Sequence, residues 1–472
     1  MTLTHIAVFG FAALIYNWLT PQRWRGWLLM IGSLIAIYWL QPALPVRQLD
    51  FVLPTATLLI TVTCWLFVRP TGAITTEDRI ALGITAGVVL CISGTRYLIP
   101  ELRLTSRPPD VPDVLLALII FATIVLLLWR ILHGRQSSLT MLIVALILIF
   151  VGAKQTYLAT ELSRVFRHWQ GQDIRLASHI DIGWLGFSYV AFRLIHTLRD
   201  RQTGQLPPLT LKAYLTYIIF FPSYTAGPID RVERFIPDYG SLPTLTAARL
   251  LDGAGRIVTG LFKKFVIADS LALIALDATN ASQATSAGGL WLLLHMYAFR
   301  LFFDFSGYSD IAIGIGILYG VRLPENFNRP YLKNNINAFW QSWHMTLSNW
   351  VRFYVFSPLS RWLLGRANRP PMIAILLVCH LSTMIIIGLW HGITWAFFIW
   401  GLWHGMGLFI HKMWSDRTRK WYIQLRKHPR RLRLWHIAGT ILTFYFVLLG
   451  WVWFALPDLS SALQVMGRLF GL

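Results

Sequence analysis

Apolar runs about as long as a membrane is thick recur along the whole chain, and they decide what it can fold into. Val114–Leu132 and Met372–Leu389 are two clear examples, each free or nearly free of charge. The hydrocarbon core of a bilayer is about 30 Å thick, which an α-helix crosses with about 20 residues. Only 13% of the residues are charged, against about 25% in an ordinary soluble domain. We therefore predict an all-α polytopic membrane protein.

Several candidate membrane segments are shorter than a full crossing. We expect these to be tilted, broken or re-entrant, which is tolerated only where protein or a watery cavity surrounds them. Counting them, we expect about 11 to 13 membrane helices. The candidate segments are His5–Leu19, Trp27–Leu40, Phe51–Val68, Ile80–Ile99, Val114–Leu132, Leu139–Val151, Ile182–Ile195, Ala213–Tyr224, Ile257–Ile274, Gly289–Phe303, Ile311–Val321, Met372–Leu389, Trp395–Ile410 and His436–Phe454.

The net charge of +21 raises the question of a nucleic-acid partner, which we exclude. The Lys and Arg residues lie between apolar runs, where they set membrane topology and meet anionic headgroups. The most basic loop, Lys412–Arg433, contains a single acid, Asp416. It is expected on the cytoplasmic side, which puts both termini outside.

We interpret Met1–Thr20 as a retained first span. The three cysteines are too few for a disulfide scaffold or a Cys-based zinc site.

Polar residues, Trp and His are concentrated between Tyr217 and Lys412, and polar groups at membrane depth are costly unless they serve a function. Within that part, Asn334–Phe356 is too polar for a lipid-facing span. Helical spacing would put Trp340, His344 and Ser348 on one face. We predict an amphipathic or re-entrant helix that carries His344 toward protein or water. The alternative is an interfacial helix with an aromatic belt and a merely hydrogen-bonded histidine.

A second histidine follows the long apolar run that ends at Leu389. Because Gly392 lets the backbone turn, His391 is expected to project between two helices. A neutral imidazole takes a proton from a hydroxyl near neutral pH. The alternative reading is a histidine that caps its helix. Leu402-Trp403-His404-Gly405 repeats the pattern 13 residues later. On a continuous helix His404 would point elsewhere than His391, and no ligand spacing there indicates a metal, so we predict no metal site.

Two carboxylates, Asp304 and Asp310, flank a Ser-rich and Gly-rich stretch. Such a pair fits general acid and base groups. More simply, we expect them to cap the backbone where a Gly-rich helix begins. Gly-x-Ser-x-Gly, P-loop and dinucleotide-binding patterns do not accompany them, which argues against a covalent serine mechanism.

Several short motifs follow one another in the second half of the chain: Phe220–Arg231, Gly260–Lys264, Phe303–Tyr308 with Pro324–Tyr331, Phe339–Ser348 and Trp390–Gly392. In this combination they resemble the membrane-bound O-acyltransferase family, in the branch of bacterial alginate O-acetylases and the teichoic-acid D-alanyl transfer protein. The resemblance covers about residues 215–410.

The branch within the family stays open. Asp230 and Arg231 favour the D-alanyl branch, whereas the 305–314 stretch favours the acetylase branch. Relatives commonly have Arg-Asp where this chain has Val351-Arg352.

What the resemblance implies is a single membrane-embedded domain over 1–472, with 1–180 mainly scaffold and 215–410 the catalytic core. It implies a ring of helices around a central tunnel and two family histidines, His344 and His391, as catalytic residues. We expect substrate contacts from residues around them and no cofactor. The expected substrate-binding residues are Asn328, Trp343, Ser348, Trp390, Asp304 and Tyr308.

The resemblance further implies an O-acyltransferase of the cytoplasmic membrane, called the inner membrane where there are two. An acyl group, most simply acetyl, would pass from a cytoplasmic thioester, acetyl-CoA or an acyl carrier protein, to a hydroxyl of an extracytoplasmic polysaccharide or of a partner protein. The partners are then this donor, that acceptor and membrane lipids. D-alanyl transfer to a teichoic-acid-type polymer is the alternative, and a transporter or flippase is the alternative of another class.

Overall fold

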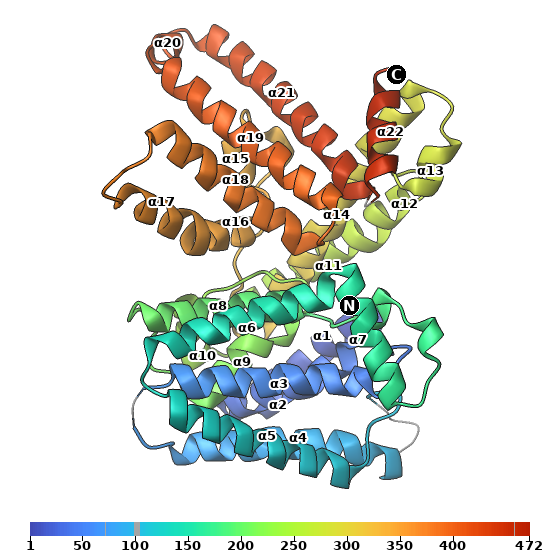
Figure 1. Cartoon of the computed structure of the whole chain (residues 1–472), viewed down its shortest axis with the longest axis vertical. Coiled ribbons are helices and arrows are strands. Elements are labelled where there is room, and N and C mark those ends of the chain that lie inside the picture. Colours follow the sequence, from blue (N-terminus) through green and yellow to red (C-terminus); the bar gives the residue numbers. More distant parts are fainter. Residues whose placement is uncertain (71, 99–103, 457) are drawn as a thin grey trace. The chain divides into compact units, whose positions relative to one another are not determined.

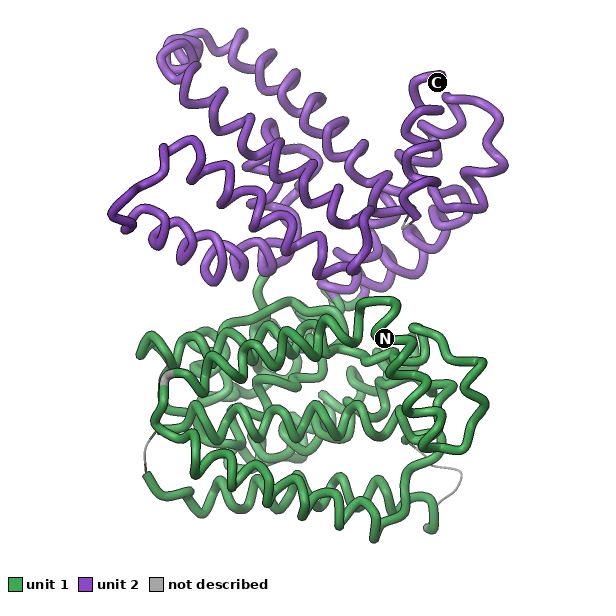
Figure 2. The backbone as a smooth tube through the Cα atoms, viewed as in Figure 1, with its two compact units in different colours: residues 1–257, 311–324 green, residues 258–310, 325–472 purple. Residues whose placement is uncertain are grey.

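The computed structural model describes residues 1–70, 72–98, 104–456 and 458–472 (Figure 1). That part of the chain forms α-helices joined by short 3₁₀ and π turns and contains no strand, which confirms the all-α class. The chain divides into two compact units (Figure 2). Unit 1 comprises residues 1–257 and 311–324, and unit 2 comprises residues 258–310 and 325–472.

Unit 1 is built on helices from the first half of the chain, and it also includes the end of α14. Within it α3 lies beside α5, α6 and α8, while α9 packs against α2, α3 and α4. Its helices are α1 (Leu3–Leu19), α2 (Gln22–Leu40), α3 (Leu49–Val68), α4 (Thr76–Leu98), α5 (Val111–Leu132), α6 (Gln136–Lys154), α7 (Thr156–Trp169), η2 (Ile174–Leu176), η3 (His179–Asp181), α8 (Phe187–Gln202), α9 (Leu211–Ile219), η4 (Phe221–Ser223), α10 (Val232–Ser241) and most of α11 (Ala247–Leu261).

Unit 2 carries the histidine motifs. Within it α18, α19 and α21 lie side by side (Figure 1), and α15 packs against α19 and α21. Its elements are η5 (Phe262–Ala268), α12 (Asp269–Ala272), α13 (Ala278–Gln283), α14 (Ala287–Leu318, shared with unit 1), η6 (Pro330–Leu332), α15 (Ile336–Trp340), α16 (Met345–Val351), η7 (Arg352–Phe356), α17 (Ser357–Leu364), α18 (Met372–His391), α19 (Trp395–Arg417), α20 (Arg419–Leu425), α21 (Pro429–Ala455) and α22 (Leu459–Leu469).

Seven of the described helices are long and apolar enough to span a bilayer, which confirms a polytopic membrane protein; they are α3, α4, α5, α6, α14, α18 and α21. The ring around a tunnel, the count of about 11 to 13 membrane helices and the single catalytic domain stay predictions.

Two predicted segments, Gly289–Phe303 and Ile311–Val321, are wrong as separate spans. They form one 32-residue helix, α14, which rises about 48 Å. The polar stretch between them suggested a break. The helix continues because lysines pair with the two carboxylates of that stretch, as described below, so the polar groups need no loop. The predicted span Ala213–Tyr224 is also wrong, because α9 ends at Ile219 and Pro222 cannot continue an α-helix.

Helices α18 and α19 pack with their backbones in contact. A Cβ on Gly388 would lie 2.2 Å from the backbone oxygen of Phe397, and one on Gly401 would lie 2.6 Å from that of Met384. Only hydrogen in place of a side chain permits this approach. The close pair fixes the end of α18, where His391 lies, against the start of α19.

Candidate functional site

Two imidazole rings and one indole come together in unit 2. The centroid of the His344 ring lies 5.9 Å from that of Trp390, and the His391 ring lies 4.6 Å from the same indole. The two imidazole centroids are therefore no farther apart than the sum of these distances. Three of the predicted site residues, His344, His391 and Trp390, thus come together around one indole.

The backbone turns sharply at His344. α15 ends at Trp340 and α16 begins at Met345, so the expected continuous helix over 334–356 is wrong. His344 is the N-cap of α16 and has φ 43° and ψ 52°. A residue with a side chain occupies this left-handed region only when the surrounding structure holds it there. Trp340 and His344 therefore do not share a helix face.

Asn326 holds this turn in place. Its backbone oxygen accepts a hydrogen bond from the Met345 amide at 2.9 Å, and its side-chain oxygen accepts one from the Thr346 hydroxyl at 2.6 Å. The Asn326 side chain also donates to Ser309 at 3.2 Å, and the residue is fully buried. Asn326 was not among the site residues predicted from the sequence. Its place beside Pro324 in a motif was the available signal.

The His344 side chain is buried among aromatic rings. The edge-to-face contact with Phe305 has a centroid distance of 4.6 Å. Among the described residues, Nε2 of His344 has no hydrogen-bond partner. Burial lowers the pKa of His344, which lies outside the spanning helices, far below its usual value. The ring is therefore neutral at physiological pH and retains a nitrogen able to bond a substrate.

His391 is the last residue of α18, and Gly392 follows it as the C-cap. The chain turns there as predicted, and α19 begins at Trp395 after the N-cap Thr394. The half-buried His391 ring contacts Trp400 at 5.8 Å and Phe454 at 4.7 Å. Aromatic groups from α19 and α21 thus orient this imidazole.

Three of the predicted substrate-binding residues stabilise the turn at His344 and do not belong to the ring cluster around Trp390. They are Trp343, Ser348 and Asn328. Trp343 is buried and stacked on Phe339 at 5.7 Å. The Ser348 hydroxyl donates to the Trp343 backbone oxygen at 3.3 Å. The backbone N–H of Asn328 donates to the backbone oxygen of Ser342 at 2.9 Å. Their backbone and ring contacts keep the segment before α16 in register with residues 326–328.

Asp304 and Asp310 lie inside α14, so the expectation that they cap a helix is wrong. Lys264 forms an ion pair with Asp304, and Lys263 lies 2.6 Å from Asp310. Tyr308 is buried on the same helix. Pairing lowers the cost of placing each charge at membrane depth. The sequence contained the signal in the adjacent lysines of an otherwise apolar stretch, but the pairing was not anticipated.

His404 lies on α19, beyond the turn at His391, and its ring contacts Trp400, as the His391 ring does. Its ring is fully buried between Trp340 at 5.2 Å and Trp400 at 4.8 Å. Within the described part of the chain, neither ring nitrogen has a hydrogen-bond partner. The predicted directions of His391 and His404 assumed one continuous helix. That assumption does not hold, because the chain turns between α18 and α19.

A group of ionisable residues in unit 1 was also missed. His196, Asp200 and Glu233 bring three potential metal-ligating atoms within 4.8 Å of one another. The spacing of His196 and Asp200 by four residues on a helix was the available signal. Arg231 lies 3.5 Å from Asp200 and 2.9 Å from Glu233, so a guanidinium already balances the carboxylates. We interpret the group as a buried charge network.

Comparison with known proteins finds a family match over most of the chain. Residues 118–449, which include both imidazoles, match the profile of the membrane-bound O-acyltransferase family. The chain belongs to this family. Membership confirms the resemblance drawn from the motifs and identifies acyl transfer as the reaction class of the chain.

Three relatives show the range of acceptors within the family. The chain is 35% identical over 286 residues to the teichoic acid D-alanyltransferase of Streptococcus thermophilus, covering 58% of this chain and 68% of that one. It is 37% identical over 262 residues to the peptidoglycan O-acetyltransferase of Helicobacter pylori, covering 55% and 46%. It is 36% identical over 288 residues to a probable alginate O-acetylase of Pseudomonas syringae pv. tomato, covering 61% and 51%. The matches thus span about half the length of the last two relatives.

Proposed function

We propose that this protein transfers an acetyl group from a thioester on the cytoplasmic side of the cytoplasmic membrane to a hydroxyl of an extracytoplasmic polysaccharide. The acceptor is either the polymer itself or a partner protein that relays the group. The observation that carries the proposal is the contact of His344 and His391 with the single indole of Trp390, inside the part of the chain that matches the family.

In the proposed mechanism His391 acts as the general base. It takes the proton of the acceptor hydroxyl as the oxygen attacks the thioester carbonyl, and the carbonyl electron pair moves to oxygen. When the tetrahedral intermediate collapses, the C–S bond breaks and the imidazolium returns its proton to the leaving thiolate. A positioned base contributes about 10²- to 10⁴-fold, and holding both substrates in one site adds an orientation advantage.

His344 orients the acceptor or polarises the carbonyl. Its neutral ring and its Nε2 without a partner in the described structure support this role. The oxyanion needs hydrogen-bond donors, and His344, Asn328 and indole N–H groups are the candidates. We assign the donor's phosphate groups to the cations of the basic segment 412–433 other than Arg433, because phosphates of CoA or a carrier arm are drawn to excess positive charge.

D-alanyl transfer is the second candidate function. The matched region covers 68% of the S. thermophilus D-alanyltransferase, a larger share than of either acetyltransferase above. In this reading the donor is a carrier-protein thioester and the acceptor a teichoic-acid-type polymer. The residues and the proton movements are the same.

Mass spectrometry of envelope polysaccharides from cells with and without the gene tests the proposal. We expect an O-acetyl ester that is lost on deletion and restored by the intact gene. A lost D-alanyl ester would select the second candidate. Identical ester content in both strains, under conditions in which the protein is present, would overturn both.

A further inference from the structure

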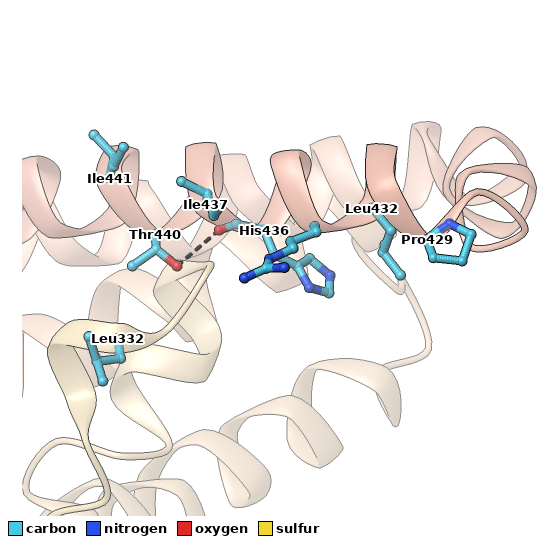
Figure 3. Close-up of a pocket in the computed structure, with 8 residues that line it drawn as sticks. Leu332, Pro429, Leu432, His436, Ile437, Thr440 and Ile441 are labelled. Atoms are coloured by element: carbon cyan, nitrogen blue, oxygen red, sulfur yellow. Dashed lines mark hydrogen bonds between the residues drawn. The ribbon is translucent and has the colours of Figure 1, made fainter.

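A groove follows the basic end of α21 in unit 2. Its volume is about 470 Å³, and its lining residues are Leu332, Pro429, Leu432, Arg433, His436, Ile437, Thr440 and Ile441. All but Leu332 belong to α21, where Leu432, His436 and Thr440 form one row along the helix and Arg433, Ile437 and Ile441 form the neighbouring row. Figure 3 shows Leu432, His436 and Thr440 on the side of α21 that faces Leu332.

The lining is cationic near one end and apolar toward the other. Arg433 lies near the start of α21 and supplies the cation. The apolar lining residues farther along the groove, Ile437, Ile441 and Leu332, have exposed fractions of 49%, 54% and 69%. The polar groups between them already have partners. The Thr440 hydroxyl donates to the His436 backbone oxygen at 2.9 Å (Figure 3), and Nε2 of His436 lies 3.2 Å from the Tyr422 hydroxyl.

The segment next to this groove is rich in cations that lack carboxylate partners. Lys412 pairs with Asp416 at 2.6 Å. The structure shows no ion pair, in the ranges it describes, for the cations that follow: Arg417, Arg419, Lys420, Arg426, Lys427, Arg430, Arg431 and Arg433. Such a cluster at the end of a spanning helix attracts the anionic headgroups of the cytoplasmic leaflet.

We propose that the groove is a binding site for one anionic phospholipid, with its phosphate at Arg433 and one acyl chain along Ile437, Ile441 and Leu332. The lined stretch of α21, residues 429–441, rises about 18 Å. That length covers one leaflet of a hydrocarbon core about 30 Å thick. The phosphate meets an unpaired guanidinium, and the acyl chain meets exposed apolar side chains.

The other phosphate-bearing chain available to this protein is the pantetheine arm of a thioester donor. Its amide groups need hydrogen-bond partners when they leave water. The groove offers few, because its hydroxyl and imidazole are already bonded within the protein. The lining therefore favours a hydrocarbon chain, and the lipid site does not depend on the proposed acyl transfer.

Lipid retention by the purified protein tests this site. The full chain is reconstituted in nanodiscs of phosphatidylglycerol and phosphatidylcholine, extracted in mild detergent, and the retained lipid is measured by mass spectrometry. Arg433→Gln removes the cation, and Ile437→Trp fills the apolar part. Arg419→Gln is the matched control, since it removes a cation that does not line the groove. Gel filtration verifies that each variant is folded.

We expect the wild type to retain phosphatidylglycerol in preference to phosphatidylcholine. Both Arg433→Gln and Ile437→Trp should lower that retention about fivefold or more, and Arg419→Gln should leave it unchanged. Equal retention in the two groove variants and the wild type would overturn the proposal. An equal loss of retention in Arg419→Gln would also overturn it, because it would show that the lipid is held by the general positive charge of the surface and not by the groove. Displacement of the lipid by excess acetyl-CoA would assign the groove to the thioester donor instead.

Discussion

At the scale of single residues, the site depends on one strained position and the groups that hold it. His344 has a left-handed backbone, a conformation that costs on the order of 1 kcal/mol or more. Asn326 offsets that cost by bonding the backbone of Met345 and the side chain of Thr346. The imidazole thus reaches its place through a neighbour 18 positions earlier in the chain.

Replacing Asn326 with Leu should release the turn. The side-chain bonds to Thr346 and Ser309 are lost, and a hydrogen bond within a protein contributes about 0.5–1.5 kcal/mol to stability. We expect a lower melting temperature in detergent and acyl transfer reduced up to about 100-fold, since a misplacement of about 1 Å has that effect. The exposed Asn349→Leu is the control and should change neither. Full activity in Asn326→Leu would contradict the role given to Asn326.

Asp230 predicts a dependence of stability on pH. Burial raises the pKa of this carboxyl to about 7, and Arg234 opposes the shift. The folded protein therefore keeps a proton that the unfolded chain loses, so this group lowers stability as the pH rises from about 4 to about 7. We expect Asp230→Asn to match the wild type near pH 4 and to melt about 2 °C or more above it at pH 8.

Thermal unfolding across that pH range measures the effect. The control is Asp252→Asn, which replaces an exposed carboxyl and should keep a constant difference from the wild type. A constant difference for Asp230→Asn as well would show that this carboxyl is not protonated in the folded protein.

Motifs made the two imidazoles predictable, but the residues that place them were less so. His344 and His391 stand in short, recognisable patterns, whereas Asn326 acts through hydrogen bonds to residues 17 to 20 positions away. The predicted helical face through Trp340, His344 and Ser348 failed for the same reason. Long-range bonds overrode the local helical period between Trp340 and Met345.

At the scale of helices, the packing of α18 against α19 sets the position of His391. The structure places the missing Cβ of Gly388 2.2 Å from a backbone oxygen of α19. Since a backbone cannot yield as a flexible side chain does, any side chain at Gly388 must separate the two helices.

A single methyl group tests this packing. Gly388→Ala should destabilise the protein by about 1–3 kcal/mol through overpacking and should lower acyl transfer by displacing His391. Gly87→Ala, on α4, adds the same methyl where nothing lies within 4 Å and should be neutral or stabilising. Unfolding curves in detergent compare the two variants. Equal behaviour would show that α18 and α19 do not touch at Gly388.

Long apolar helices were predictable from hydropathy. Whether a helix continues through a polar stretch was not. α5 and α18 have nearly the predicted bounds. α14 runs through two predicted spans, because Lys263 and Lys264 neutralise the carboxylates of its polar stretch. Pairing between distant segments cannot be read from the local hydropathy that suggested a break.

At the scale of the whole molecule, the distribution of charge predicts topology. The basic segment 412–433 runs from the end of α19 through α20 to the start of the spanning helix α21. Short basic connections of this kind stay on the cytoplasmic side. The sequence therefore predicted a multi-pass membrane protein with an extracytoplasmic C-terminus. The arrangement of helices into a ring rests on the family resemblance alone.

A reporter that works only in the cytoplasm tests this topology. Fused after Leu472 it should be inactive, and inserted between Arg426 and Lys427 it should be active, because the positive-inside rule keeps that segment in the cytoplasm. Activity of the fusion after Leu472 would reverse the predicted orientation, and with it the side assigned to the thioester donor.

The central claim, acyl transfer by two imidazoles that share one indole, is tested most directly by the polysaccharide ester made by histidine variants. Cells lacking the gene receive the wild type, His344→Ala, His391→Ala or the exposed control His133→Ala, and mass spectrometry measures the O-ester per polymer. The account predicts wild-type ester content for His133→Ala and at least about 100-fold less for the other two, at equal amounts of membrane-inserted protein. Full ester content in both His344→Ala and His391→Ala would contradict it.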